Sequence, residues 1–155
     1  MKKNCSTKTQ ITLFDALRAQ YGFDENSNFR YYNCNPYHVK TNDCVIRAIT
    51  AGTGSSWNKI VSDLSRYMLK YGYMINTPEI YGLYLKDKGW VKCKAPTKRK
   101  GLSMTVGEFV STFKGHAIAH VDDNHVTYIA DGKIWDLWDP SEHIIGEYWV
   151  PANEL

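Results

Sequence analysis

A chain of 155 residues fits a single domain and is long enough to bury a hydrophobic core. Hydrophobic residues make up 43% and charged residues 23%, which excludes a disordered or fibrous chain. The formal net charge of +3 does not by itself indicate a nucleic-acid partner, and no apolar run is long enough for a membrane-spanning helix.

The sequence of the N-terminal part predicts an extension that precedes the other helices and the strands. Residues 12–21 have the pattern of a short amphipathic helix, and residues 22–40 are rich in Asn and Tyr and indicate a loop or extended chain. We therefore interpret residues 1–155 as one domain, with residues 1–35 as an N-terminal helix and loop extension.

A cysteine opens the next predicted helix. Thr41, Asn42 and Asp43 can each cap a helix that starts at Cys44, and the residues that follow are apolar on most of the helix circumference. Gly52 indicates the end of this helix. Cys44 is then in the first turn of a buried helix, where the positive end of the dipole favours a thiolate. A buried structural cysteine is the alternative.

Three more helices and then a sheet are predicted. Helices are expected from Ser56 to Tyr71, from Pro78 to about Gly89 and from Thr105 onward, because apolar residues recur at helical spacing or capping residues precede them. Strands are expected at 116–121, 125–130, 133–139 and 144–150. Helices followed by antiparallel strands indicate the α+β class.

The four cysteines, Cys5, Cys34, Cys44 and Cys93, form neither a CxxC pair nor a disulfide framework. No apolar stretch of signal-peptide length follows the first ten residues. We therefore expect free thiols in a reducing cytoplasm. Cys34, His38 and Cys44 are potential ligands, but their spacing matches no common zinc site, so neither a metal nor another cofactor is expected.

A histidine and an aspartate flank the strongest hairpin signal. If Asp131 and Gly132 form a two-residue loop, His125 and Asp136 lie on one face as diagonal neighbours, with Trp138 opposite His125. A histidine held by a carboxylate is what a nucleophilic thiol needs. A solvated Asp136 and a merely structural His125 are the alternative. The other strand histidines, His116 and His120, lack this turn and acid, and so does His143.

These motifs resemble the papain-like cysteine peptidase superfamily in a compact, single-domain form. "NDCVIRAI" is similar to its nucleophile segment, and "HVTYIADGKIWDLWD" to its histidine strand, turn and third-residue strand. The order H…DG…D-x-W-D…YW, over residues 36–150, also resembles small proteins of this class encoded by phages and their bacterial hosts. The resemblance implies that a buried central helix carrying the nucleophile packs against a C-terminal antiparallel sheet, with Cys44, His125 and Asp136 as the triad.

One element of the family pattern is missing. Papain-like enzymes usually carry a Gln about six residues before the cysteine, which helps to hold the oxyanion. This chain has His38 at that distance and Asn42 nearer. Either side chain could donate a hydrogen bond to the oxyanion, together with the backbone N–H of Cys44.

The function expected from these features is a cysteine hydrolase, foremost a peptidase that cleaves peptide or isopeptide bonds in a protein or peptide substrate. It would act in the cytoplasm of a bacterial cell or a phage-infected host. The same triad also suits deamidation or acyl transfer. A protein-binding module that keeps the fold with little or no turnover is the second hypothesis. Nucleic-acid binding through the basic run 92–100 is the third and is not expected. The oligomeric state stays open.

Overall fold

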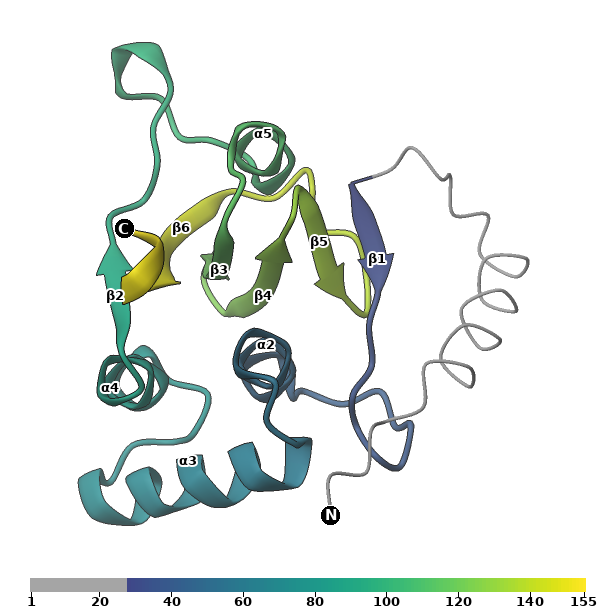
Figure 1. The fold of residues 1–155 in the computed structure, drawn as a ribbon, viewed down its shortest axis with the longest axis vertical. Helices are drawn as coiled ribbons and strands as arrows, with labels where there is room; N and C mark the ends of the chain where they lie inside the picture. The colour runs from purple at the N-terminus through teal and green to yellow at the C-terminus, as the bar shows by residue number, and fades with distance from the viewer. Residues whose placement is uncertain (1–27) are drawn as a thin grey trace.

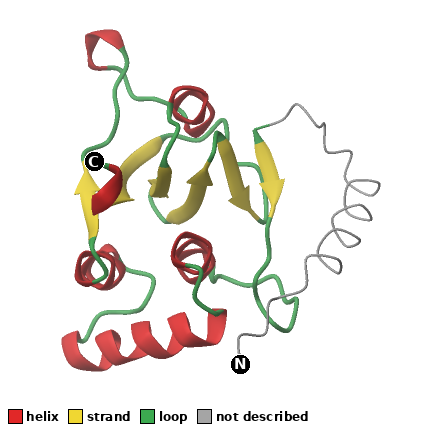
Figure 2. Ribbon diagram, viewed as in Figure 1, coloured by secondary structure: helices red, strands yellow, loops and turns green. Residues whose placement is uncertain are grey.

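The computed structural model describes residues 28–155. The predicted helix at 12–21 and Cys5 lie outside them. Within residues 28–155 the chain forms four α-helices and one mixed six-stranded sheet, in the order β1-β5-β4-β3-β6-β2 (Figures 1 and 2). The elements are β1 (Phe29–Tyr31), α2 (Cys44–Thr53), α3 (Trp57–Tyr71), α4 (Pro78–Asp87), β2 (Trp90–Cys93), α5 (Val106–Thr112), β3 (His116–Val121), β4 (His125–Ala130), β5 (Lys133–Asp136) and β6 (Ile145–Pro151).

Helices cover both faces of the sheet, unequally. Helices α2 and α4 lie against one face, with α3 outside them, and α5 lies on the other face (Figure 1). Each face has its own core: residues of α2, α3 and α4 pack with Val126 and Tyr128 of β4, whereas residues of α5 pack with Ile129 and Ile134. This separation follows from the alternation of side chains along a strand. The α+β class is therefore present.

The sheet differs from the predicted C-terminal antiparallel one. β1 comes from the segment predicted as loop or extended chain, and it pairs in parallel with β5. β2 comes from between the helices and pairs antiparallel with β6. The central order β5-β4-β3-β6 is antiparallel, as expected. A three-residue edge strand is too short to show a period in the sequence, so its partner cannot be read locally.

The hairpin between β4 and β5 has the predicted two-residue loop. Asp131 and Gly132 both have positive φ, 53° and 70°, which a tight hairpin turn requires. Ala130 therefore pairs with Lys133, and Ile129 pairs with Ile134. β5 is shorter than predicted and ends at Asp136.

The helix that begins at Cys44 is longer than predicted. It passes through Gly52 and ends at Thr53, with Gly54 in the left-handed conformation at φ 67°. A Cβ at Gly52 would lie 3.0 Å from side-chain atoms of both Trp90 and Ile118. Gly52 thus allows α2 to approach the sheet closely, and Gly54 ends the helix. None of the helices within residues 28–155 has both the length and the apolar composition needed to cross a membrane.

Candidate active site

Cys44 is the first residue of α2, as the sequence predicts. Its side chain is partly buried and packs against the core formed by α2, α3 and α4. Asp43 occupies the capping position, but its side chain makes no capping hydrogen bond, contrary to the capping role expected for this segment. The first N–H groups of α2 therefore have no capping bond from the Asp43 side chain, and a helix N-terminus favours an anionic sulfur at Cys44.

His125 and Asp136 meet at the end of the hairpin. Nε2 of His125 lies 2.7 Å from Oδ2 of Asp136. Asp136 is only 2% exposed, and its Oδ1 accepts a hydrogen bond of 2.7 Å from the backbone N–H of Leu137. Because His125 begins β4 and Asp136 ends β5, both lie at the end of the sheet where α2 starts. The carboxylate thus fixes the imidazole ring beside Cys44.

Cys44 and His125 line the same cleft, and each changes the pKa of the other. Burial by itself raises the pKa of the Cys44 thiol, but its bond to His125, the charge of His125 and the backbone of Val126 together lower the pKa below its usual value. Burial disfavours a charged His125, yet its bonds to Asp136 and Cys44 outweigh this and raise its pKa to about 9. Both shifts are in the direction that favours a thiolate beside an imidazolium.

A buried ion network holds the carboxylate of Asp136, and it was not predicted from the sequence. Nη2 of Arg47 lies 3.2 Å from Oδ1 of Asp136, and Nη1 of Arg47 pairs with Asp43. Trp57 Nε1 donates to Oδ2 of Asp43 at 2.9 Å. The available signal was that Arg47 is the lone charge in an apolar helix, four residues after an aspartate.

A cleft of about 590 Å³ opens over the thiol. Asn42 and Trp138 line it together with Cys44 and His125. His38 does not line it: its side chain is exposed and its backbone N–H closes a turn to Asn35. The remaining residues that line the cleft are Lys40, Thr41, Arg47, Asn76, Asn124 and Leu137. Of the two expected oxyanion donors, the structure brings only Asn42 to the site, and it adds Asn76 and Asn124.

Trp138 covers the imidazole. Its ring centroid lies 4.8 Å from that of His125, with 40° between the ring planes. The centroid of the indole also lies 5.0 Å from that of the His143 ring in an edge-to-face arrangement, and Nδ1 of His143 lies 2.5 Å from Oδ2 of Asp122. The indole is 41% exposed, so it is both a roof over His125 and part of the cleft wall.

The competing histidines and cysteines lie in other surroundings. His116 contacts Glu154, with 3.1 Å between Nδ1 and Oε1. Burial raises the pKa of Cys34, the opposite of the direction at Cys44. Cys93 is on β2 with a weak contact to a backbone oxygen. Within residues 28–155, no three His, Cys, Asp or Glu side chains are arranged to hold a metal ion.

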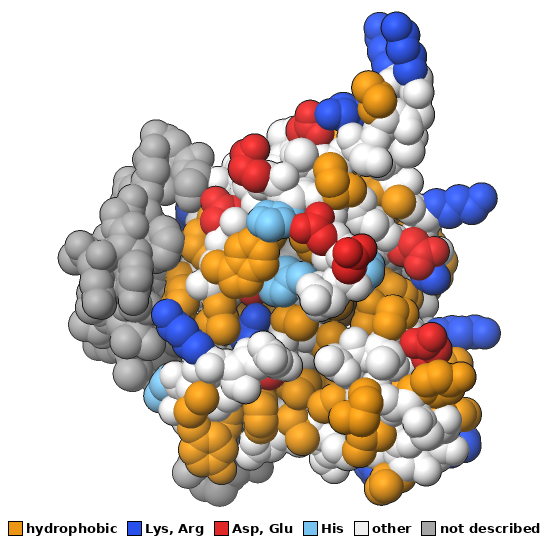
Figure 3. All heavy atoms as spheres, turned by 180° about the vertical axis from the view of Figure 1, so that it is seen from behind, with side chains coloured by type: hydrophobic (Ala, Val, Ile, Leu, Met, Phe, Trp, Pro, Cys, Tyr) orange, Lys and Arg blue, Asp and Glu red, His pale blue; other side chains and the backbone are white. Residues whose placement is uncertain are grey.

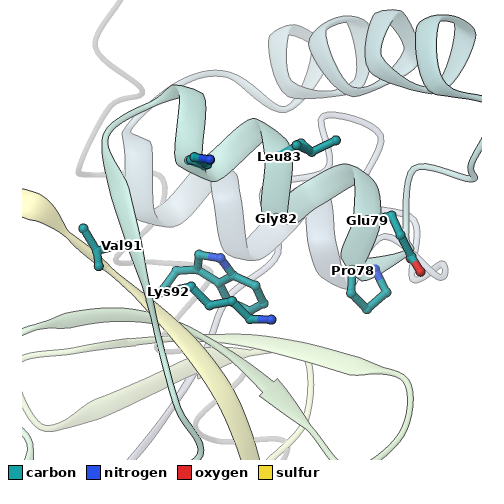
Figure 4. A pocket seen from close by; sticks show the side chains of 8 residues that line it. Pro78, Glu79, Gly82, Leu83, Val91 and Lys92 are labelled. Carbon is teal, nitrogen blue, oxygen red and sulfur yellow. The ribbon is translucent and has the colours of Figure 1, made fainter.

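A second hollow and the basic run lie apart from these residues. The hollow, about 480 Å³, lies between α4 and β2 and is lined by Pro78, Leu83, Val91 and Lys92 among others, with none of the predicted site residues (Figure 4). Beyond β2 the chain forms a projecting loop, residues 94–103, and Lys and Arg side chains gather at its tip (Figures 1 and 3). Lys98 in this loop is paired with Glu108.

Comparisons of the chain with family models, with curated proteins and with solved structures found no match. The functional argument therefore depends on the geometry of Cys44, His125 and Asp136 and on the chemistry that these groups support.

We expect Cys44 to react with iodoacetamide at about pH 6 much faster than Cys5, Cys34 or Cys93, because only a lowered pKa leaves an appreciable thiolate fraction there. Labelling followed by peptide mass mapping measures the four rates separately. Urea-unfolded protein is the control, in which the four rates should converge. Equal rates in the folded protein would contradict an activated thiol.

Proposed function

We propose that this protein is a cysteine hydrolase, foremost a papain-like peptidase, in which Cys44 is the nucleophile, His125 the acid and base, and Asp136 the residue that orients His125. One observation carries the proposal: a largely buried imidazole that is bonded to a buried carboxylate lies against a thiol at a helix N-terminus and lowers the pKa of that thiol. A histidine that contacts only an acid is common. A thiol, an imidazole and a carboxylate placed in that order are the arrangement that nucleophilic catalysis requires.

The reaction follows from the protonation states. The Cys44 thiolate attacks the carbonyl carbon of an amide, and the electron pair moves to the carbonyl oxygen. When the tetrahedral species collapses, the C–N bond breaks and the His125 imidazolium gives its proton to the leaving amine. Neutral His125 then takes a proton from water, which attacks the thioester. The thioester opens to a carboxylic acid, and the imidazolium and thiolate are restored.

The developing oxyanion needs donors beside the nucleophile. The backbone N–H of Cys44, at the start of α2, and the side-chain amide of Asn42 are the two candidates nearest to the nucleophile in sequence, and the amides of Asn76 and Asn124 also line the cleft. Asn42 would then replace the Gln that papain-like enzymes usually carry.

The cleft is open, and amide and hydroxyl side chains form part of its lining, so it suits an extended protein or peptide chain more than a small enclosed ligand. Such side chains suit hydrogen bonds to a substrate backbone. We place the reaction in the cytoplasm of a bacterial cell or phage-infected host. Isopeptide cleavage, deamidation and acyl transfer use the same thioester, and the acyl donor and acceptor decide among them.

A protein-binding module with the same fold is the second candidate. The position of His38 outside the cleft favours it, since Asn42 is then the one expected side-chain donor for the oxyanion. A weakened oxyanion site lowers turnover by orders of magnitude while leaving substrate binding largely intact.

A proteome-derived peptide library digested with wild-type protein and with Cys44→Ala tests the proposal. We expect new termini with wild type and none above background with Cys44→Ala, because alanine removes the nucleophile and little of the packing. Mass spectrometry of the termini also defines the residues preferred on each side of the cleaved bond. Identical digests, together with capture of the same intact proteins by both forms, would favour the binding module instead.

A further inference from the structure

Three buried charges lie directly behind the proposed catalytic groups. Asp43, Arg47 and Asp136 are 3%, 4% and 2% exposed. The two carboxylates and one guanidinium carry one net negative charge, and the imidazole of His125 lies directly against one of these carboxylates. Buried charges are costly unless they are paired, so the network has its own reason to hold a positive imidazole.

The hydrogen bonds of Asp136 are divided between its two oxygens. Oδ1 accepts from the backbone N–H of Leu137 at 2.7 Å and lies 3.2 Å from Nη2 of Arg47. Oδ2 is then directed to Nε2 of His125. With Oδ1 held at two points, the carboxylate cannot rotate freely, and the direction of Oδ2 is fixed.

Arg47 is itself held from the opposite side. Its Nη1 pairs with Oδ1 of Asp43, and Trp57 Nε1 on α3 donates to Oδ2 of Asp43. A contact of 3.4 Å from Nη1 to the backbone oxygen of Thr41 adds to this. The guanidinium therefore bridges two carboxylates in a fixed place, and Asp43 is used for this pairing instead of capping α2.

We propose that Arg47 and Asp43 are positioning residues that extend the triad into five groups of alternating charge: thiolate, imidazolium, carboxylate, guanidinium, carboxylate. This inference rests on the proposed function for its catalytic meaning. Arg47 orients Asp136 and favours the thiolate. Asp43 balances Arg47, so that Asp136 retains enough negative potential to support the imidazolium.

The charged groups around His125 come from several elements. Cys44 and Arg47 belong to α2, Asp136 to β5, and Asp122 to the turn between β3 and β4. His143 lies beyond Trp138 and pairs with Asp122. Within this set Asp43 and Arg47 touch neither Asp122 nor His143 in any contact described above, so changes at them act on the site through Asp136 or through their own charges.

The test measures the second-order rate of Cys44 alkylation by iodoacetamide from acid to alkaline pH, in the full-length chain. Arg47→Met removes a positive charge near the thiol, so the profile should move to higher pH by about one unit. Asp43→Asn removes a negative charge but keeps an acceptor for Trp57, so the profile should move to lower pH by about one unit. Arg47→Lys should lie between wild type and Arg47→Met.

The matched control is Arg66→Met on α3, which removes an Arg from the separate ion network around the buried Asp63 and should leave the profile unchanged. Shifts of opposite sign support the proposal, because a structural defect alone would move both variants in one direction. Shifts of the same sign, or none, overturn it. If Arg47→Met does not fold by circular dichroism, Asp43→Asn decides alone: a shift to lower pH supports the proposal, and any other result overturns it.

Alkylation needs no turnover, so this test separates the two proposals. A wild-type protein that cleaves no peptide, but shows the opposite shifts, overturns the hydrolase and supports the positioning role of Arg47 and Asp43. A protein that cleaves peptides but shows no shifts supports the hydrolase and overturns the positioning role of Arg47 and Asp43.

Discussion

Replacing His125 by alanine is expected to lower the rate of Cys44 alkylation at about pH 6 by at least tenfold, and peptide cleavage by about a thousandfold or more. The imidazolium stabilises the thiolate through a hydrogen bond and through its charge, and both are lost in the variant. Cleavage suffers more than alkylation, because it also needs a proton for the leaving amine. Stopped-time labelling and kcat/KM on a peptide found in the digest measure the two effects.

His116→Ala is the matched control for His125→Ala. His116 also begins a strand and also pairs with a carboxylate, that of Glu154, but it lies at the other end of the sheet from the start of β4. Its removal should leave both rates within about twofold of wild type. Equal effects of the two substitutions would mean that His125 is not the base.

The pH dependence of kcat/KM in the wild-type protein is a further test of His125. The pKa of His125 is raised to about 9, so the imidazolium is present below that pH and is lost as the pH rises through it. The alkaline limb of kcat/KM should therefore lie near pH 9, well above the range of an ordinary histidine. The contribution of charged His125 to the free energy of unfolding depends on pH in the same direction. It is complete below the pKa of an ordinary histidine and is lost as the pH rises through about 9.

The second large effect is expected at Asp136, on both stability and catalysis. Asp136→Ala removes the acceptor of His125 Nε2, of the Leu137 N–H and of Arg47 at once. We expect a loss of about 3 kcal/mol in the free energy of unfolding, because buried donors lose their partner, and a fall in kcat/KM of about a thousandfold or more. Urea unfolding and steady-state kinetics measure these two quantities.

Two further substitutions sharpen this prediction. Asp136→Asn keeps an oxygen that can accept from His125, so it should retain more activity than Asp136→Ala while still weakening the imidazolium. Asp139→Ala, at an exposed acid three residues on, should change neither quantity appreciably. An Asp136→Ala protein as active as wild type would show that the imidazole of His125 needs no carboxylate. Asp136 would then not be the residue that orients His125.

The parts of the site that the sequence predicts depend on local rules. Asp131-Gly132 requires positive φ at two consecutive residues, and this fixes the hairpin register and so brings His125 and Asp136 together. Cys44 is at the start of α2 because a polar segment gives way there to an apolar one. Thr105 and Glu108 form the capping box that their spacing predicts.

What the sequence did not predict depends on contacts between distant segments. Gly52 has the local character of a helix end, yet it lies inside α2 because Trp90 and Ile118 leave no room for a side chain. His38 has the sequence distance of an oxyanion donor, but the turn at Asn35 directs the chain elsewhere. Arg47 contacts Asp136 across 89 positions of sequence, and no local pattern indicates such a partner.

The sheet order has a consequence for how the chain could be divided. The outermost strands, β1 and β2, come from the first part of the chain and flank four inner strands that all come from the second. A cut in the projecting loop at 94–103 would leave the sulfur on one fragment and both the imidazole and the carboxylate on the other. Neither piece could then complete its sheet without its counterpart, so any chemistry recovered from the mixed fragments would report their complementation.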